Sequence, residues 1–152
     1  MKLAKYLKLS QINVELQAEN KSAVLEVLVQ ILVENGQLLG EMVEEVMNKL
    51  TERESLTSTG LGYGVGLPHV KTDAVDKIQI VFGRSTKGID FDALDGNLVH
   101  FFFLILAPNT LTDEYLKVIS AISGLMKDEN VRRRLILAQG AEEIFKIIGQ
   151  GA

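Results

Sequence analysis

Residues Val99–Leu106 read VHFFFLIL, and nearly every position in this stretch is apolar. A short, continuous apolar run that is rich in aromatic and branched side chains is typical of a strand covered on both faces. A second β-rich run, Lys77–Phe82 (KIQIVF), precedes it. The residues between the two, Lys87–Asn97 (KGIDFDALDGN), contain the Lys-Gly and Asp-Gly pairs that are common in turns. These stretches predict neighbouring strands at the centre of a sheet.

Helical periodicity occurs on both sides of these strands in the sequence. Residues 21–34 and 41–54 each place apolar side chains on one face, with Asn20 able to cap the first helix and Gly36 able to end it. Further helices are predicted over 113–126, around 131–136 and around 144–148. The positions expected to face the core are Val24, Val27, Leu28, Ile31, Met42, Val43, Val46, Met47, Leu50, Leu116, Ile119, Ile122, Met126, Val131, Leu135, Ile136, Ile144, Phe145 and Ile148. This order predicts an α/β sandwich with a mixed central β-sheet flanked by helices on both sides.

The composition is that of a soluble globular protein, with 47% apolar and 24% charged residues. A length of 152 residues without repeats or a linker predicts a single domain over residues 1–152. Lysines interrupt the apolar residues at the amino terminus, so no signal peptide is expected, and no apolar run is long enough for membrane insertion. The absence of cysteine fits a reducing compartment, and we expect a cytoplasmic protein.

The net charge of −4 argues against nucleic acid as a partner. The one basic cluster, Arg132–Arg134, has no interleaved aromatic residues, so a solvated helix face is the favoured interpretation.

The chain has two histidines, and His69 follows a glycine-rich segment, GLGYGVGLP, over residues 60–68. Glycines permit unusual backbone conformations and let another molecule approach closely. Pro68 fixes its own φ and restricts Leu67, so the imidazole is carried by a stiffened backbone. A neutral imidazole is nucleophilic near neutral pH. From spacing alone, a nucleophile and an ordinary hydrogen-bonded histidine both remain open.

Other kinds of site fit this segment poorly. It lacks the Gly-Lys-Ser/Thr of a phosphate-binding P-loop, and its glycines follow a predicted helix and not the strand of a dinucleotide fingerprint. No metal site is expected, because there is no cysteine and no acidic residue at a ligand-like spacing from His69. A histidine-dependent hydrolase would need a paired base, and Thr72 and Asp73 are at no diagnostic spacing. The second histidine, His100, lies in the apolar strand beside Phe102, and a half-buried structural role is favoured.

Three separated pieces of the sequence carry a resemblance. Arg53–Gly60 (RESLTSTG) followed by Gly64–His69 (GVGLPH) is the first, Ile89–Gly96 (IDFDALDG) the second and Val99–Pro108 (VHFFFLILAP) the third. Together they resemble the fructose/mannitol-type enzyme IIA family of the sugar phosphotransferase system, which includes the nitrogen-regulatory enzyme IIA proteins. The family pattern is Arg-Glu, Ser-Thr-Gly, then Gly-Val-x-hydrophobic-Pro-His. The resemblance covers essentially the whole chain.

The resemblance implies that His69 accepts a phosphoryl group from the phosphocarrier HPr or its nitrogen-branch relative. The group would pass to an enzyme IIB domain or serve as a regulatory mark. Arg53 would lie beside His69 and contact the phosphoryl oxygens. Without the resemblance, Arg53 would be interpreted as a solvated residue at a helix end. The segment with Gly62, Gly64, Gly66 and Pro68 would belong to the docking face. No cofactor is needed, because the phosphoryl group arrives on another protein.

The sequence departs from this family at one position. Family members usually carry a second histidine at the start of the helix after the Ala-Pro turn, and here Tyr115 aligns with it. A tyrosine donates a neutral hydrogen bond but adds no positive charge near neutral pH. We therefore keep two hypotheses: a phosphohistidine carrier with Tyr115 as auxiliary donor, and a regulatory docking module of the same fold with weak or no phosphotransfer.

Overall fold

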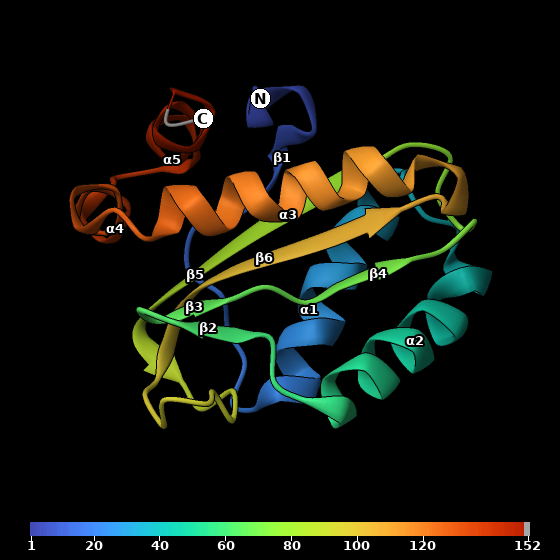
Figure 1. Cartoon of the computed structure of the whole chain (residues 1–152), viewed down its shortest axis with the longest axis horizontal. Coiled ribbons are helices and arrows are strands. Elements are labelled where there is room, and N and C mark those ends of the chain that lie inside the picture. The colour runs from blue at the N-terminus through green and yellow to red at the C-terminus, as the bar shows by residue number, and fades with distance from the viewer. Residues whose placement is uncertain (151–152) are drawn as a thin grey trace.

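The computed structural model describes residues 1–150 and is built on one mixed, six-stranded sheet (Figure 1). The strands are β1 (Leu7–Asn13), β2 (Gly60–Gly62), β3 (Val65–Gly66), β4 (His69–Lys71), β5 (Gln79–Ile89) and β6 (Val99–Ala107). Their order is β1-β5-β6-β3-β2, and β4 also pairs with β6. β5 and β6 are antiparallel, whereas β1 is parallel to β5, and both β3 and β4 are parallel to β6.

Helices cover both faces of the sheet, which confirms the predicted α/β sandwich (Figure 1). The α-helices are α1 (Lys21–Glu34), α2 (Val43–Leu56), α3 (Thr112–Met126), α4 (Glu129–Leu137) and α5 (Ala141–Gln150), with short 3₁₀ turns at Leu3–Lys5, Gly40–Met42 and Asn109–Leu111. Within residues 1–150 no helix is long and apolar enough to cross a membrane.

The alternation of side chains along β6 divides the interior into two cores. Phe101 and Phe103 pack in the core that α3, α4 and α5 cover. Phe102 and Leu104, which point to the opposite face, pack with α1 and α2. Because β6 is buried on both faces, its continuous apolar sequence is explained, and the prediction of a central strand is confirmed.

Of the four positions of α3 expected to face the core, Ile122 and Met126 are buried and Ile119 packs against the core, but one was wrong. Leu116 was expected to face the core, but its side chain is 54% exposed, whereas Tyr115 is buried together with Val118 and Ile122. Both sets of residues have helical spacing, so the sequence pattern alone does not distinguish them. The consequence is that Tyr115 belongs to the interior of the fold and Leu116 to its surface.

Two further details of the sheet differ from expectation. Strand β1 was not predicted, because its pairing with β5 shifts register between Leu7 and Ile12 and its burial does not alternate regularly. The Lys87-Gly88 pair was expected to form a turn, but both residues lie within β5, where the register with β6 shifts between Arg84 and Ile89. Gly88 adopts a positive φ of 84°, which allows the backbone to make this register shift within the strand.

The segment that leads to His69 runs along β6, and its pairing with β6 is interrupted once. β3 pairs with the first half of β6 and β4 with its second half. Leu67 and Pro68 lie between them, and the carbonyl of Pro68 accepts a hydrogen bond from the backbone N–H of Ile105 at 3.0 Å. Proline has no N–H to donate to a neighbouring strand, so the pairing is interrupted at Pro68. β4 and its histidine therefore lie at an edge of the sheet.

Candidate functional site

His69 lies in a cleft of about 430 Å³ between the end of α2, strand β4 and the first turns of α3. Its side chain is half-buried. The cleft is lined by Lys49, Glu52, Arg53, Leu56, His69, Val70, Lys71, Asn109, Tyr115, Leu116 and Ile119. The structure thus brings His69, Arg53 and Tyr115 together from three separate elements.

The hydrogen bonding of the imidazole distinguishes its two nitrogens. Nδ1 of His69 is 2.6 Å from the carbonyl oxygen of Leu67. A carbonyl oxygen can only accept, so Nδ1 carries the proton in the neutral ring and Nε2 carries the free lone pair. Burial lowers the pKa of His69 below its ordinary value, with a smaller effect in the same direction from Arg53, although the Leu67 carbonyl opposes this change. The ring is therefore neutral, and nucleophilic at Nε2, at neutral pH.

Tyr115 extends from the first turns of α3 toward the histidine. The centroids of the two rings are 6.0 Å apart, with an angle of 52° between their planes. Tyr115 is only 7% exposed, and burial raises the pKa of its hydroxyl to about 12. The hydroxyl stays protonated at physiological pH, so it can donate a hydrogen bond but supplies no charge.

Cationic side chains line the cleft from two sides. Arg53 lies in the last turn of α2, and its Nη1 donates to the carbonyl of Thr57 at 3.0 Å. Lys49 lies one turn earlier, with its Nζ 3.2 Å from the carbonyl of Lys71. The Nζ of Lys71 in turn donates to the hydroxyl of Thr112 at 3.0 Å. The positive charge that Tyr115 does not supply is thus present on other residues of this cleft.

The two lysines were missed in the sequence analysis, although their spacing carries a signal. Lys49 precedes Arg53 by four residues, which places both on one face of α2. Lys71 follows His69 by two residues, which places both on one face of β4. A search for cations at these two spacings would have found them.

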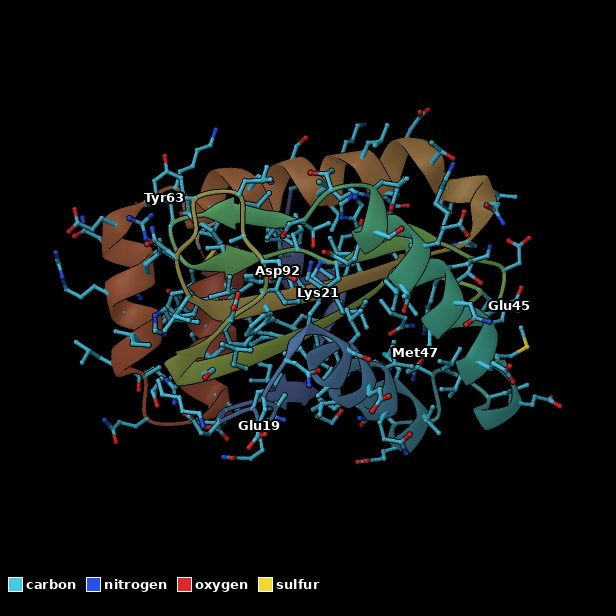
Figure 2. All side chains as sticks on the ribbon, turned by 90° about the horizontal axis from the view of Figure 1, so that it is seen from below. Glu19, Lys21, Glu45, Met47, Tyr63 and Asp92 are labelled. Atoms are coloured by element: carbon cyan, nitrogen blue, oxygen red, sulfur yellow. The ribbon has the colours of Figure 1, made fainter. Side chains whose placement is uncertain are left out.

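The glycines that precede His69 do not all lie beside it. Gly62, Tyr63 and Gly64 form the tip of the β2–β3 hairpin, and all three have positive φ values, of 88°, 60° and 75°. Arg132 of α4 stacks on the Tyr63 ring, 4.7 Å from its centroid. Figure 2 shows Tyr63 at the opposite end of the molecule from Glu45 of α2.

The other two predicted docking residues are buried. A Cβ on Gly66 would lie 3.2 Å from the Phe102 ring, so this glycine allows the close approach of β3 to the sheet interior. Pro68 is buried as well. Whether any of these residues, with Gly62 and Gly64, contacts a partner stays a prediction.

His100 occupies a different environment from His69. Its ring is half-buried, and Nδ1 is 3.0 Å from the carbonyl of Ser85. A Cβ on Gly88 would lie 2.8 Å from the ring, so the bulge in β5 makes room for this imidazole. These contacts fit the structural role favoured from the sequence. In residues 1–150 no group of three or more His, Cys, Asp or Glu side chains is arranged to hold a metal ion.

Comparison with known proteins identifies the family. Residues 5–151 match the family model described as phosphoenolpyruvate-dependent sugar phosphotransferase system, EIIA 2. The chain is 34% identical over 142 residues to the fructose-specific EIIA component of Haloferax volcanii, which covers 93% of this chain and 91% of that protein. The chain therefore belongs to the enzyme IIA family of the phosphotransferase system, as the resemblance in its sequence implied.

Solved structures agree in fold. The crystal structure of nitrogen regulatory protein IIA-Ntr from Neisseria meningitidis is similar with a TM-score of 0.88 and 32% identity, covering 96% of this chain and 98% of that one. Enzyme IIA of mannitol from Escherichia coli, solved by NMR in complex with phosphorylated enzyme IIB, is similar with a TM-score of 0.77 and 25% identity, covering 95% and 99%. These relatives include both a sugar-branch and a regulatory protein, so the chain has a phosphocarrier or regulatory role.

Proposed function

We propose that this protein is a phosphohistidine carrier whose Nε2 atom of His69 accepts a phosphoryl group from an HPr-like protein. The observation that carries the proposal is the hydrogen bond from Nδ1 of His69 to the Leu67 carbonyl at 2.6 Å. It leaves Nε2 unprotonated in a side chain that lines a cationic cleft. A neutral, oriented nitrogen of this kind is what a histidine nucleophile requires.

The transfer step follows from this geometry. The lone pair of Nε2 attacks the phosphorus, the new N–P bond forms as the donor's N–P bond breaks, and the donor's imidazole keeps the released electron pair. The proton of His69 stays on Nδ1, and its hydrogen bond to the Leu67 carbonyl becomes stronger as positive charge develops on the ring. Arg53 is proposed to stabilise the charge on the phosphoryl oxygens, and Tyr115 to donate an auxiliary hydrogen bond.

The acceptor is proposed to be an enzyme IIB domain or a regulatory target protein. The likeness to an enzyme IIA solved in complex with phosphorylated enzyme IIB supports the first, and the likeness to a nitrogen regulatory protein supports the second. The proposal includes a cytoplasmic location and one domain over residues 1–152, of which the last two lie outside the described residues. The glycine segment, with Gly62, Gly64, Gly66 and Pro68, is kept as a proposed part of the docking region.

A second candidate function is a docking module in which phosphotransfer is weak or absent. The observation that favours it is the buried, uncharged Tyr115 at the position where family members usually carry a second histidine. Phosphorylation could coexist with docking, because added negative charge changes which surfaces bind.

The test is to incubate the purified protein with phosphoenolpyruvate, enzyme I and HPr, or with their nitrogen-branch relatives, and to record its intact mass. We expect an acid-labile gain of one phosphoryl group in the wild type and in His100→Gln, and no gain in His69→Ala. The His100→Gln variant is the matched control because it removes the chain's other imidazole. If folded wild-type protein gains nothing from either donor pair, the carrier proposal is wrong and the docking module replaces it.

A further inference from the structure

Glu54 is a buried carboxylate at the end of α2, next in sequence to Arg53. It is 6% exposed and accepts hydrogen bonds from the hydroxyl of Thr59 and, at 3.3 Å, from the Thr59 backbone N–H. The Nζ of Lys21, at the start of α1, is 3.1 Å from the same carboxylate. A buried carboxylate is stable only when donors and a cation surround it in this way. Glu54 therefore holds α1, α2 and Thr59 in one fixed arrangement.

The surroundings of Lys21 complete this arrangement. Lys21 lies over the ring of Phe91, 5.0 Å from its centroid, and 4.0 Å from the carboxylate of Asp92. Figure 2 shows Lys21 and Asp92 next to each other. The hydroxyl of Ser58 donates to the carbonyl of Phe91 at 3.3 Å, one residue before Thr59. The segment at 89–96, which the resemblance singled out without a role, thus supports the residues that surround Glu54.

Thr59 connects this carboxylate to the nucleophile. The carbonyl of Thr59 accepts a hydrogen bond from the backbone N–H of Leu67 at 3.0 Å. The carbonyl of Leu67 accepts the bond from Nδ1 of His69 at 2.6 Å. The path from the buried carboxylate to the carbonyl that orients the imidazole therefore runs through Thr59 and Leu67, and both residues are buried.

The hydrogen bond between Thr59 and Leu67 closes a glycine-rich hairpin. Gly62, Tyr63 and Gly64 have positive φ values, and glycines impose little stiffness on a backbone. Inside this segment β3 pairs with β6, and the base of the hairpin needs a contact of its own. The Thr59–Leu67 hydrogen bond joins the two ends of the hairpin, and Glu54 anchors the Thr59 side of it.

We propose that Glu54 is the positioning residue for His69: by holding Thr59 it holds Leu67, whose carbonyl keeps the imidazole proton on Nδ1 and leaves Nε2 as the reacting nitrogen. A neutral imidazole can carry its proton on either nitrogen, and the partner of the ring decides which. The role of this tautomer in phosphotransfer rests on the proposed function, whereas the tautomer itself can be measured without it. Glu54 acts through Thr59 and Leu67 and is not a group that contacts the phosphoryl oxygens.

The decisive variant is Glu54→Gln, which keeps the shape of the side chain. A glutamine offers one acceptor oxygen and two N–H donors, so it cannot satisfy both donors of Thr59 together with Lys21. The matched control is Glu45→Gln, which makes the same chemical change on the exposed face of the same helix (Figure 2). A second variant, Thr59→Val, keeps the backbone N–H and the branched shape but removes the hydroxyl donor.

The measurement is a long-range ¹H–¹⁵N NMR spectrum of the histidine rings in the unphosphorylated protein, at about pH 8, where imidazoles are neutral. With two histidines in the chain, His100 serves as the internal control, because its Nδ1 has a separate partner in Ser85. In the wild type and in Glu45→Gln we expect the widely separated ¹⁵N shifts of an Nδ1–H ring for His69. In Glu54→Gln we expect these two shifts to move toward each other, with His100 unchanged.

The same variants are then phosphorylated by the HPr-like donor. We expect Glu54→Gln to take up the phosphoryl group about tenfold more slowly than Glu45→Gln, because only the fraction of rings with a free Nε2 lone pair can react. A folded Glu54→Gln protein whose His69 keeps the Nδ1–H form overturns the inference. If Glu54→Gln does not fold, an unchanged tautomer in Thr59→Val overturns it equally. Wild-type protein that takes up no phosphoryl group refutes the proposed function and leaves the tautomer result standing.

Discussion

The rings of His69 and Tyr115 approach each other in one cleft, with centroids 6.0 Å apart and planes tilted by 52°. His69 comes from an edge strand of the sheet and Tyr115 from the helix that follows β6, so the two rings meet only in the folded chain. Family members usually have a second histidine where this protein has Tyr115. The electrostatic difference is that Tyr115 remains neutral, because burial raises its pKa to about 12.

Replacing Tyr115 with phenylalanine separates the contribution of its hydroxyl from that of its ring. We expect Tyr115→Phe to keep the fold, since the ring still fills its buried position. The rate of phosphoryl gain should fall about two- to tenfold, equivalent to the loss of one neutral hydrogen bond of about 0.5–1.5 kcal/mol. Time courses of intact mass give this rate. An unchanged rate would mean that Tyr115 only packs against the site.

The charge and the shape of Arg53 can be tested separately. Arg53→Ala should slow phosphorylation about 10- to 100-fold, the equivalent of a charge-assisted hydrogen bond of about 1.5–3 kcal/mol. Arg53→Lys should be intermediate, because lysine keeps the charge but cannot contact two oxygens with one planar group. The measurement is again the time course of phosphoryl gain.

The matched control for Arg53 is Arg133→Ala. Arg133 is an exposed arginine of α4 that pairs with Glu129 at 3.2 Å, and it is not among the residues that line the His69 cleft. Its loss should leave the rate unchanged. Equal rates for Arg53→Ala and Arg133→Ala would show that Arg53 does not contact the phosphoryl group.

The lowered pKa of His69 predicts how stability depends on pH. Burial places the folded-state pKa below the ordinary value of 6.5, so between these two values the unfolded chain binds more protons than the folded one. The contribution of His69 is therefore fully present above about pH 7 and is lost as the pH falls through the folded-state pKa. When the pH is lowered from about 7 to about 5, the free energy of unfolding measured by urea denaturation should fall more for the wild type than for His69→Gln.

An NMR titration of the His69 ring measures the same effect directly. The midpoint should lie below 6.5. A midpoint at or above that value, or an equal pH dependence of the urea midpoint in His69→Gln, would contradict the interpretation.

The elements that sequence reasoning found are those with a regular pattern. Val99–Ala107 is buried on both faces and reads as an unbroken apolar run, so its place at the centre of the sheet was predictable. β1 could not be found in this way, because the register shift between Leu7 and Ile12 removes the alternation of buried and exposed side chains. In α3 the pattern allowed two faces, and only packing against the sheet shows that Tyr115, and not Leu116, is buried.

The site was predictable in its residues but not in its chemistry. The resemblance pointed to His69, Arg53 and Tyr115, and folding brings all three into one cleft. The protonated nitrogen of His69 depends on where the Leu67 carbonyl lies, and no sequence pattern encodes that distance. The role of Glu54 was equally hidden, since Lys21 reaches it only through the packing of α1 on α2, and Thr59 only through the course of the chain after α2.

Arg84 provides a test of the fold that is independent of the His69 site. This buried guanidinium donates to the carbonyls of Val14 at 2.9 Å and of Leu135 and Ala138 at 2.8 Å each, and so joins the chain after β1 to the end of α4. Arg84→Met removes the donors and leaves these carbonyls without that partner, which should cost about 3 kcal/mol of unfolding free energy. Arg134→Met, an exposed arginine of the same protein, should change it by less than about 0.5 kcal/mol. Urea denaturation followed by circular dichroism measures both, and equal midpoints for the two variants would show that the buried arginine does not hold α4 to the sheet.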